Sequence, residues 1–203
     1  MILTLTYIVL LSGLAPLFIQ LVYKPKLENH QLILFGWFVT KIISDLITFI
    51  CFKYYHLNIF PVFHVSVLIE NLLLVAYFNS FNLVSKKIKR LLLLIPIFIL
   101  FFEISIYSSI FKLNSISILT YTFSISILML LLLFHMKNNS IRSNFYLIAH
   151  LFLFHSVSFI YFLFENLRRF DTELNSMVFP IYFCFILFLN LYYSYYLWLM
   201  RKS

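Results

Sequence analysis

Lys41, Asp45 and Glu70 are ionisable residues that interrupt long apolar runs of the chain. A charge placed at the middle of a lipid bilayer costs about 2.5–3.5 kcal/mol on insertion scales, so each of these residues calls for a reason. Lys41 and Asp45 are four residues apart, which puts them on one face of a helix as a potential ion pair. Glu70 would then be left to hold a charged solute or to carry protons. A structural ion pair that locks two helices together accounts for the same residues.

Four further polar residues lie in apolar runs and are candidates for the same site. His64 and Asn71 are seven residues apart and share a helical face, and His155 lies near the centre of a later run. Asn190 occupies a position like that of Asn71, since each follows a Phe-Pro pair at the same distance. Hydrogen bonds between helices, worth about 0.6 kcal/mol on average, are the alternative role for such groups. The predicted substrate-binding or proton-coupling residues are therefore Lys41, Asp45, His64, Glu70, Asn71, His155 and Asn190.

Several kinds of active site are excluded by the residues that the chain lacks. Gly13 and Gly36 are its only glycines, which excludes a P-loop, a dinucleotide fingerprint and a nucleophile elbow. His150 and His155 are five residues apart and point to different sides of a helix, so the sequence predicts no metal site and no cofactor. An intramembrane hydrolase that uses His64 or His155 with a carboxylate is the weakest alternative, and no catalytic residue is assigned.

Seven long apolar stretches carry these residues and fill most of the chain. Hydrophobic residues make up 63% of the sequence and charged residues 11%, against about 45–50% and 25% in soluble domains. Each stretch can cross a hydrocarbon layer of about 30 Å as a helix. We therefore predict an all-α membrane protein, a single bundle over residues 1–203 in contact with the lipid bilayer. Its seven transmembrane helices are expected at residues 2–23, 32–52, 59–79, 91–110, 116–136, 144–165 and 176–199.

The net charge of +8 is distributed as in a membrane protein, which argues against a nucleic-acid partner. Ten Lys and Arg residues fall in the first, third and fifth connectors and the C-terminus, and four fall in the other connectors. The positive-inside rule then places the N-terminus outside and the C-terminus in the cytoplasm, in the cell membrane of a bacterium. The basic run at residues 86–90 is interpreted as a topology determinant that could also hold anionic lipid headgroups. It consists of Lys86, Lys87, Lys89 and Arg90.

An internal repeat is suggested by matched residues in distant stretches. Phe60-Pro61 and Asn71 align without gaps with Phe179-Pro180 and Asn190, and Leu5-Thr6-Tyr7 matches residues 119–121. The candidate halves are residues 1–80 and 115–200 in parallel, joined by a linker helix at 91–110. This 3+1+3 topology resembles that of the SWEET and PQ-loop sugar transporters, and more loosely small multi-span proteins of bacteria. The resemblance implies that Asn71 and Asn190 face a substrate pocket near mid-membrane.

Two classes of function are compatible with these observations. The first is a small-solute transporter or solute-binding bundle with a polar site at mid-membrane. The second is a non-catalytic membrane subunit or sensor that acts through a partner or as a homo-oligomer, using its basic connectors and the Arg201-Lys202-Ser203 tail. The sequence leaves the solute unidentified.

Overall fold

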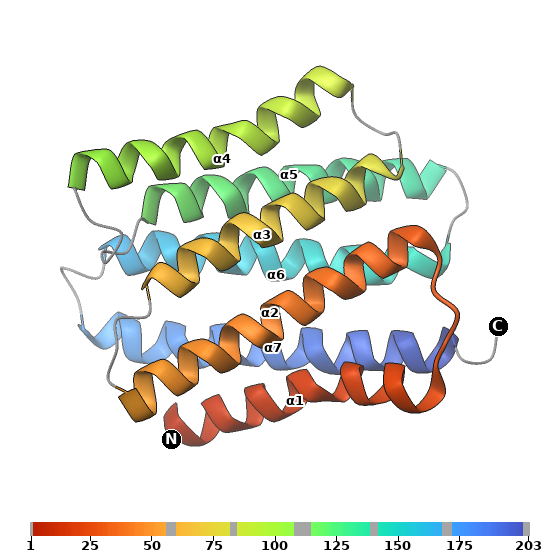
Figure 1. Cartoon of the computed structure of the whole chain (residues 1–203), viewed down its shortest axis with the longest axis horizontal. Helices are drawn as coiled ribbons and strands as arrows, with labels where there is room; N and C mark the ends of the chain where they lie inside the picture. The colour runs from red at the N-terminus through yellow and green to blue at the C-terminus, as the bar shows by residue number, and fades with distance from the viewer. Residues whose placement is uncertain are drawn as a thin grey trace. The chain divides into compact units, whose positions relative to one another are not determined.

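The chain is almost entirely helical in the part that the computed structural model describes, which is residues 2–55, 60–81, 85–107, 115–138, 142–167 and 172–200. These residues form seven helices (Figure 1). In a membrane each backbone N–H and C=O must find its partner within the segment, and the helix achieves this. The helices are α1 Ile2–Tyr23, α2 Asn29–Tyr55, α3 Phe60–Asn79, α4 Lys86–Tyr107, α5 Ser115–Asn138, α6 Arg142–Leu167 and α7 Thr172–Met200.

Five of the helices contain segments long and apolar enough to cross a membrane. The segments are Leu5–Tyr23, Asn29–Tyr55, Pro61–Asn79, Phe145–Leu163 and Pro180–Met200, and α5 adds the shorter apolar segment Ile118–Phe134. The predicted all-α, multi-pass membrane protein is thus confirmed. The predicted span at 91–110 overlaps α4, and its last three residues lie outside the described part of the chain. Seven crossings of the membrane therefore stay a prediction.

One compact unit comprises Met1–Leu27 and Ser126–Ser203. Within it α7 packs against both α1 and α6, and Figure 1 shows these helices running alongside one another. Its core is made of large apolar and aromatic side chains, which fill the space between helices that contain few glycines. The buried residues include Val9, Leu128, Met129, Leu132, Leu147, Ile148, Leu151, Leu189, Tyr193 and Leu197.

The second compact unit comprises Glu28–Ile125. Here α3 packs against α2 and, less extensively, against α4. Its core includes Leu34, Trp37, Phe38, Leu74, Tyr77, Phe78, Ile118 and Tyr121. The repeat halves 1–80 and 115–200 have other boundaries than the two units, and the repeat stays a prediction.

Side chains and backbone groups close several helix ends. At the start of α2 the backbone N–H of Glu28 donates to Gln31 Oε1 at 2.8 Å, which is one half of a capping box. Ser85 Oγ accepts a 3.4 Å hydrogen bond from the N–H of Ile88 at the start of α4. After α1, Lys24 adopts a left-handed conformation with φ of 45°, and its N–H donates to Gln20 O at 3.1 Å. These contacts satisfy backbone groups that a helix cannot pair within itself.

Candidate functional site

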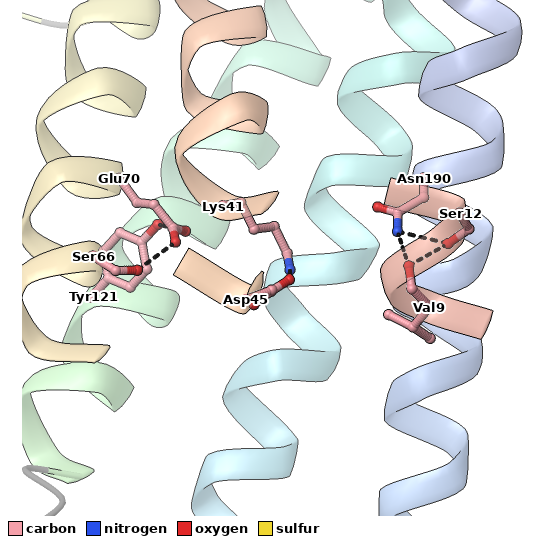
Figure 2. Close-up of polar contacts among 8 residues, drawn as sticks. All are labelled: Val9, Ser12, Lys41, Asp45, Ser66, Glu70, Tyr121 and Asn190. Atoms are coloured by element: carbon pink, nitrogen blue, oxygen red, sulfur yellow. Dashed lines mark hydrogen bonds and ion pairs between the residues drawn. The ribbon is translucent and has the colours of Figure 1, made fainter. Parts of the chain in front are cut away.

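An ion pair lies near the midpoint of α2. Lys41 Nζ is 2.6 Å from Asp45 Oδ2, one helical turn further along the chain (Figure 2). The Lys41 side chain is 9% exposed and that of Asp45 is 44% exposed. The spacing of four residues brings the two groups together on one face. Because the ammonium group is the more deeply buried partner, it depends on Asp45 for compensation of its charge.

Glu70 lies near the midpoint of α3 and receives hydrogen bonds from uncharged groups. The Ser66 hydroxyl donates to Oε1 at 3.2 Å, and the Tyr121 hydroxyl of α5 donates to Oε2 at 3.5 Å (Figure 2). The indole of Trp37, on α2, also interacts with this side chain. Lys41 and Asp45 lie within electrostatic reach of the Glu70 carboxylate. Three of the predicted residues, Lys41, Asp45 and Glu70, therefore lie close enough for their charges to interact, within a single compact unit.

Helical periodicity explains how α2 presents its residues to this neighbourhood. Leu34, Trp37, Phe38 and Lys41 are all buried and recur at intervals of three and four residues. This face packs in a unit where α2 and α3 are neighbours. Lys41 follows apolar residues on this buried face, so its methylene groups can be buried among apolar side chains. Its charged end then needs a partner on the same helix, and Asp45 provides one.

His64 and Asn71 lie on α3, in the same compact unit as Lys41 and Glu70. Both side chains are almost fully buried, and each takes part in further interactions. Their shared burial agrees with their spacing of seven residues, which returns them to the same face of α3. A buried imidazole and a buried amide carry donors and acceptors that must be satisfied inside the protein. Asn71 directly follows Glu70 in the sequence, and His64 precedes it by six residues.

Asn190 lies near the midpoint of α7, in the other compact unit, and its amide joins α7 to α1. Asn190 Nδ2 donates to Ser12 Oγ at 2.9 Å and to Val9 O at 3.3 Å (Figure 2). Ser12 Oγ in turn donates to Val9 O at 2.7 Å. The three groups form a small buried network between two packed helices. Its geometry is that of an interhelical hydrogen bond, which is the alternative role named above for membrane asparagines.

His155 is the predicted site residue contributed by α6. The side chain is almost fully buried, and its ring lies 5.1 Å from that of Phe154 between centroids. The neighbouring hydroxyl of Ser158 donates to Phe154 O at 2.8 Å, so this polar group is satisfied within its own helix. His155 and Asn190 thus belong to one compact unit, and the other five predicted residues belong to the second.

Some partners in these contacts were not singled out by the sequence. Ser66 is four residues before Glu70, so helical spacing alone could have identified it. Ser12 and Tyr121 come from segments far away in the chain, and an aromatic or hydroxyl residue in an apolar run carries no signal of which carboxylate or amide it meets. In the predicted headgroup cluster Lys87 and Arg90 are exposed at the start of α4. The side chains of Lys86 and Lys89 lie outside the described part of the structure.

Comparison with protein-family models, curated proteins and solved structures found no match to this chain. The function must therefore be inferred from the site itself. Within the described residues, no group of three or more His, Cys, Asp or Glu side chains could hold a metal ion. What α2, α3 and α5 do provide is an ion pair, a second carboxylate, two hydroxyl donors and one indole. This set can bind a charged or hydrogen-bonding solute, or exchange protons.

Proposed function

We propose that this protein is a small-solute transporter or solute-binding membrane protein whose polar site lies at mid-membrane between α2 and α3. The observation that carries the proposal is the grouping of Lys41, Asp45 and Glu70 near the midpoints of two packed, apolar helices. Each charge costs several kcal/mol at that depth, and intramembrane ionisable residues commonly face a substrate or ion pathway. Ser66 and Tyr121 add hydroxyl groups that can orient a solute.

A purely structural ion pair is the strongest competing explanation. Buried ion pairs are often replaceable by apolar residues without loss of stability, so an ion pair kept for packing alone has little energetic reason to be there. It also does not account for Glu70, whose carboxylate adds a further charge beside the pair. The transport proposal explains the pair and the extra carboxylate together.

Uptake by purified protein in liposomes tests the proposal. Proteoliposomes would be screened with sugars, amino acids, organic cations and organic anions, with and without a proton gradient. We expect saturable uptake of one class, and at least a tenfold loss of it in the Asp45→Asn and Glu70→Gln variants. Glu28→Gln is the matched control, because it makes the same acid-to-amide change at the exposed head of α2. No uptake of any class, or uptake indifferent to both site variants, would refute the proposal.

The membrane orientation is part of the same proposal. We place the N-terminus outside and the C-terminus in the cytoplasm of a bacterial inner membrane, because the basic residues are distributed that way. The halves 1–80 and 115–200 are proposed as parallel repeats on the ground of their matched residues. In a background with Cys51→Ser and Cys184→Ser, a membrane-impermeant maleimide should label Lys53→Cys in intact cells. It should label Lys87→Cys only after permeabilisation. The opposite pattern would reverse the orientation.

The basic cluster at the start of α4 is proposed to contact anionic lipid headgroups from the cytoplasmic side. Lys87 and Arg90 are exposed there, and each basic residue near such a surface contributes about 1 kcal/mol. Thermal unfolding in nanodiscs of phosphatidylcholine with or without phosphatidylglycerol measures this contact. We expect the anionic lipid to stabilise the parent protein more than a Lys87→Gln/Arg90→Gln variant. Equal stabilisation of the two would contradict the assignment.

A further inference from the structure

The charges around Glu70 do not balance. Lys41 and Asp45 neutralise each other at 2.6 Å. The direct partners of the Glu70 carboxylate, Ser66 and Tyr121, are uncharged hydroxyl groups. Among the described side chains, Lys41 is the only cation that acts on Glu70. Two carboxylates and one ammonium group leave one negative charge at this place.

Movement of Lys41 between the two carboxylates cannot remove that charge. If Lys41 turned from Asp45 to Glu70, Asp45 would be left in the same condition. Figure 2 shows the Lys41 side chain extended toward Asp45 and away from the Glu70 carboxylate. A carboxylate without a counter-charge in an apolar interior is strongly unfavourable, and hydrogen bonds from neutral donors offset only part of that cost. The unit therefore needs one positive charge that its described side chains do not supply.

The groups around Glu70 also provide oxygen ligands. Ser66 Oγ contacts Oε1 of the carboxylate and Tyr121 Oη contacts Oε2, and the two hydroxyl groups come from different helices, α3 and α5. A hydroxyl group donates to a carboxylate when the site is empty, and its oxygen lone pairs can turn to a cation when the site is filled. Of the other titratable groups on α2 and α3, Lys41 and Asp45 act on Glu70, and His64 lies six residues before it on α3.

We infer that Glu70, with Ser66 and Tyr121, is the binding site for a small monovalent cation that supplies the missing positive charge. This inference rests on the proposed transport function and assigns it a substrate or coupling-ion class. The shared chemistry is a single positive charge on a particle small enough to be bound by the oxygens of Ser66, Glu70 and Tyr121. Its possible sources are a proton, an alkali-metal ion or a primary alkylammonium ion, and the experiment separates them.

Trp37 offers a direct probe of this site. Its buried indole interacts with the Glu70 side chain, and the chain has only one other tryptophan, Trp198. In full-length Trp198→Phe protein in nanodiscs, Trp37 emission would be titrated with NaCl, KCl and methylammonium chloride at constant ionic strength, and separately with pH. We expect a saturable change in at least one of these four titrations. A saturable change with one of the three salts at constant pH identifies that ion, and a change with pH alone identifies a proton.

The variants decide whether that change comes from Glu70. Glu70→Gln keeps the size of the side chain and removes the charge, so the response should disappear, whereas the Glu28→Gln control should keep it. Tyr121→Phe should weaken the apparent affinity for an alkali-metal or alkylammonium ion about two- to tenfold, through loss of one oxygen ligand. It should instead strengthen the binding of a proton, because Tyr121 donates to the ionised carboxylate. Tyr121→Phe also provides the test if Glu70→Gln fails to fold. No saturable response in the parent protein, an unchanged response in Glu70→Gln, or an unchanged affinity in Tyr121→Phe would overturn the inference.

Failure of this inference and failure of the transport proposal give different results. If the protein takes up an uncharged solute saturably and Glu70→Gln does not change this uptake, the transport proposal stands and the cation site is refuted. If Trp37 emission responds to a cation in a way that depends on Glu70 but no solute is taken up, the cation site stands and the transport proposal is refuted.

Discussion

Removal of either partner of the Lys41–Asp45 ion pair should destabilise the protein, and the two losses should not add. Truncating one partner of a fully buried ion pair costs about 3–5 kcal/mol, and of an exposed pair about 0.2–1 kcal/mol. This pair lies between these limits, because the Lys41 side chain is 9% exposed and that of Asp45 is 44% exposed. Asp45→Asn removes the direct partner of the more deeply buried charge and leaves it only its interaction with Glu70, so we expect a loss of about 2 kcal/mol. Lys41→Met leaves the more exposed carboxylate of Asp45 and also removes the cation that acts on Glu70, so about 1–2 kcal/mol is expected.

The double variant Lys41→Met/Asp45→Asn removes both charges and should be more stable than the sum of the single losses predicts. A coupling free energy of about 1–2 kcal/mol is expected for two groups in direct contact. Equilibrium unfolding in mixed detergent micelles, followed by Trp37 emission, measures all four proteins. Lys53→Met, the same exchange at the end of α2, is the control and should stay within about 0.5 kcal/mol of the parent. Losses that add within about 0.5 kcal/mol would show that the two charges do not interact.

Three other substitutions test separate contacts. Asn190→Leu removes the two hydrogen bonds of the amide to α1 and should lower the unfolding free energy by about 1 kcal/mol in mixed micelles. The loss should be smaller when Asn190→Leu is introduced into a Ser12→Ala variant. Equal losses with and without Ser12→Ala would contradict the contact. Gln31→Ala removes the capping hydrogen bond at the start of α2 and should lower the free energy of unfolding by about 0.5–1 kcal/mol, whereas Gln31→Glu should retain the cap. Equal stabilities of the two variants would show that the capping hydrogen bond does not contribute. Gly36→Ala places a methyl group where nothing beyond the backbone of its own helix lies within 4 Å, and should stabilise the protein by about 1 kcal/mol, seen as a higher melting temperature. A lower melting temperature would mean that the site is closely packed.

The sequence predicted those features of the fold that depend on residues close together in the chain. Apolar length determines that a segment crosses a membrane as a helix, and the spacing of Lys41 and Asp45 determines that they meet on α2. The partner of a polar residue on another helix is a matter of tertiary packing, which a run of Phe, Leu and Ile does not encode in any periodic way. For this reason Asn190 was predicted as a site residue without Ser12, and Glu70 without Tyr121.

The amide contact of Asn190 has a consequence for how α1 moves. Pro16 has no N–H, so the carbonyl of Ser12 lacks its usual partner within the helix, and α1 is softened one turn after its attachment to α7. Side chains of α1 are exposed both before and after Pro16: Leu11 is 66%, Phe18 63% and Leu21 74% exposed. The weakened turn therefore lies directly after the point where Asn190 holds α1 against α7. Amide hydrogens in the turn around Pro16 should exchange with solvent faster than those in the turn around Val9.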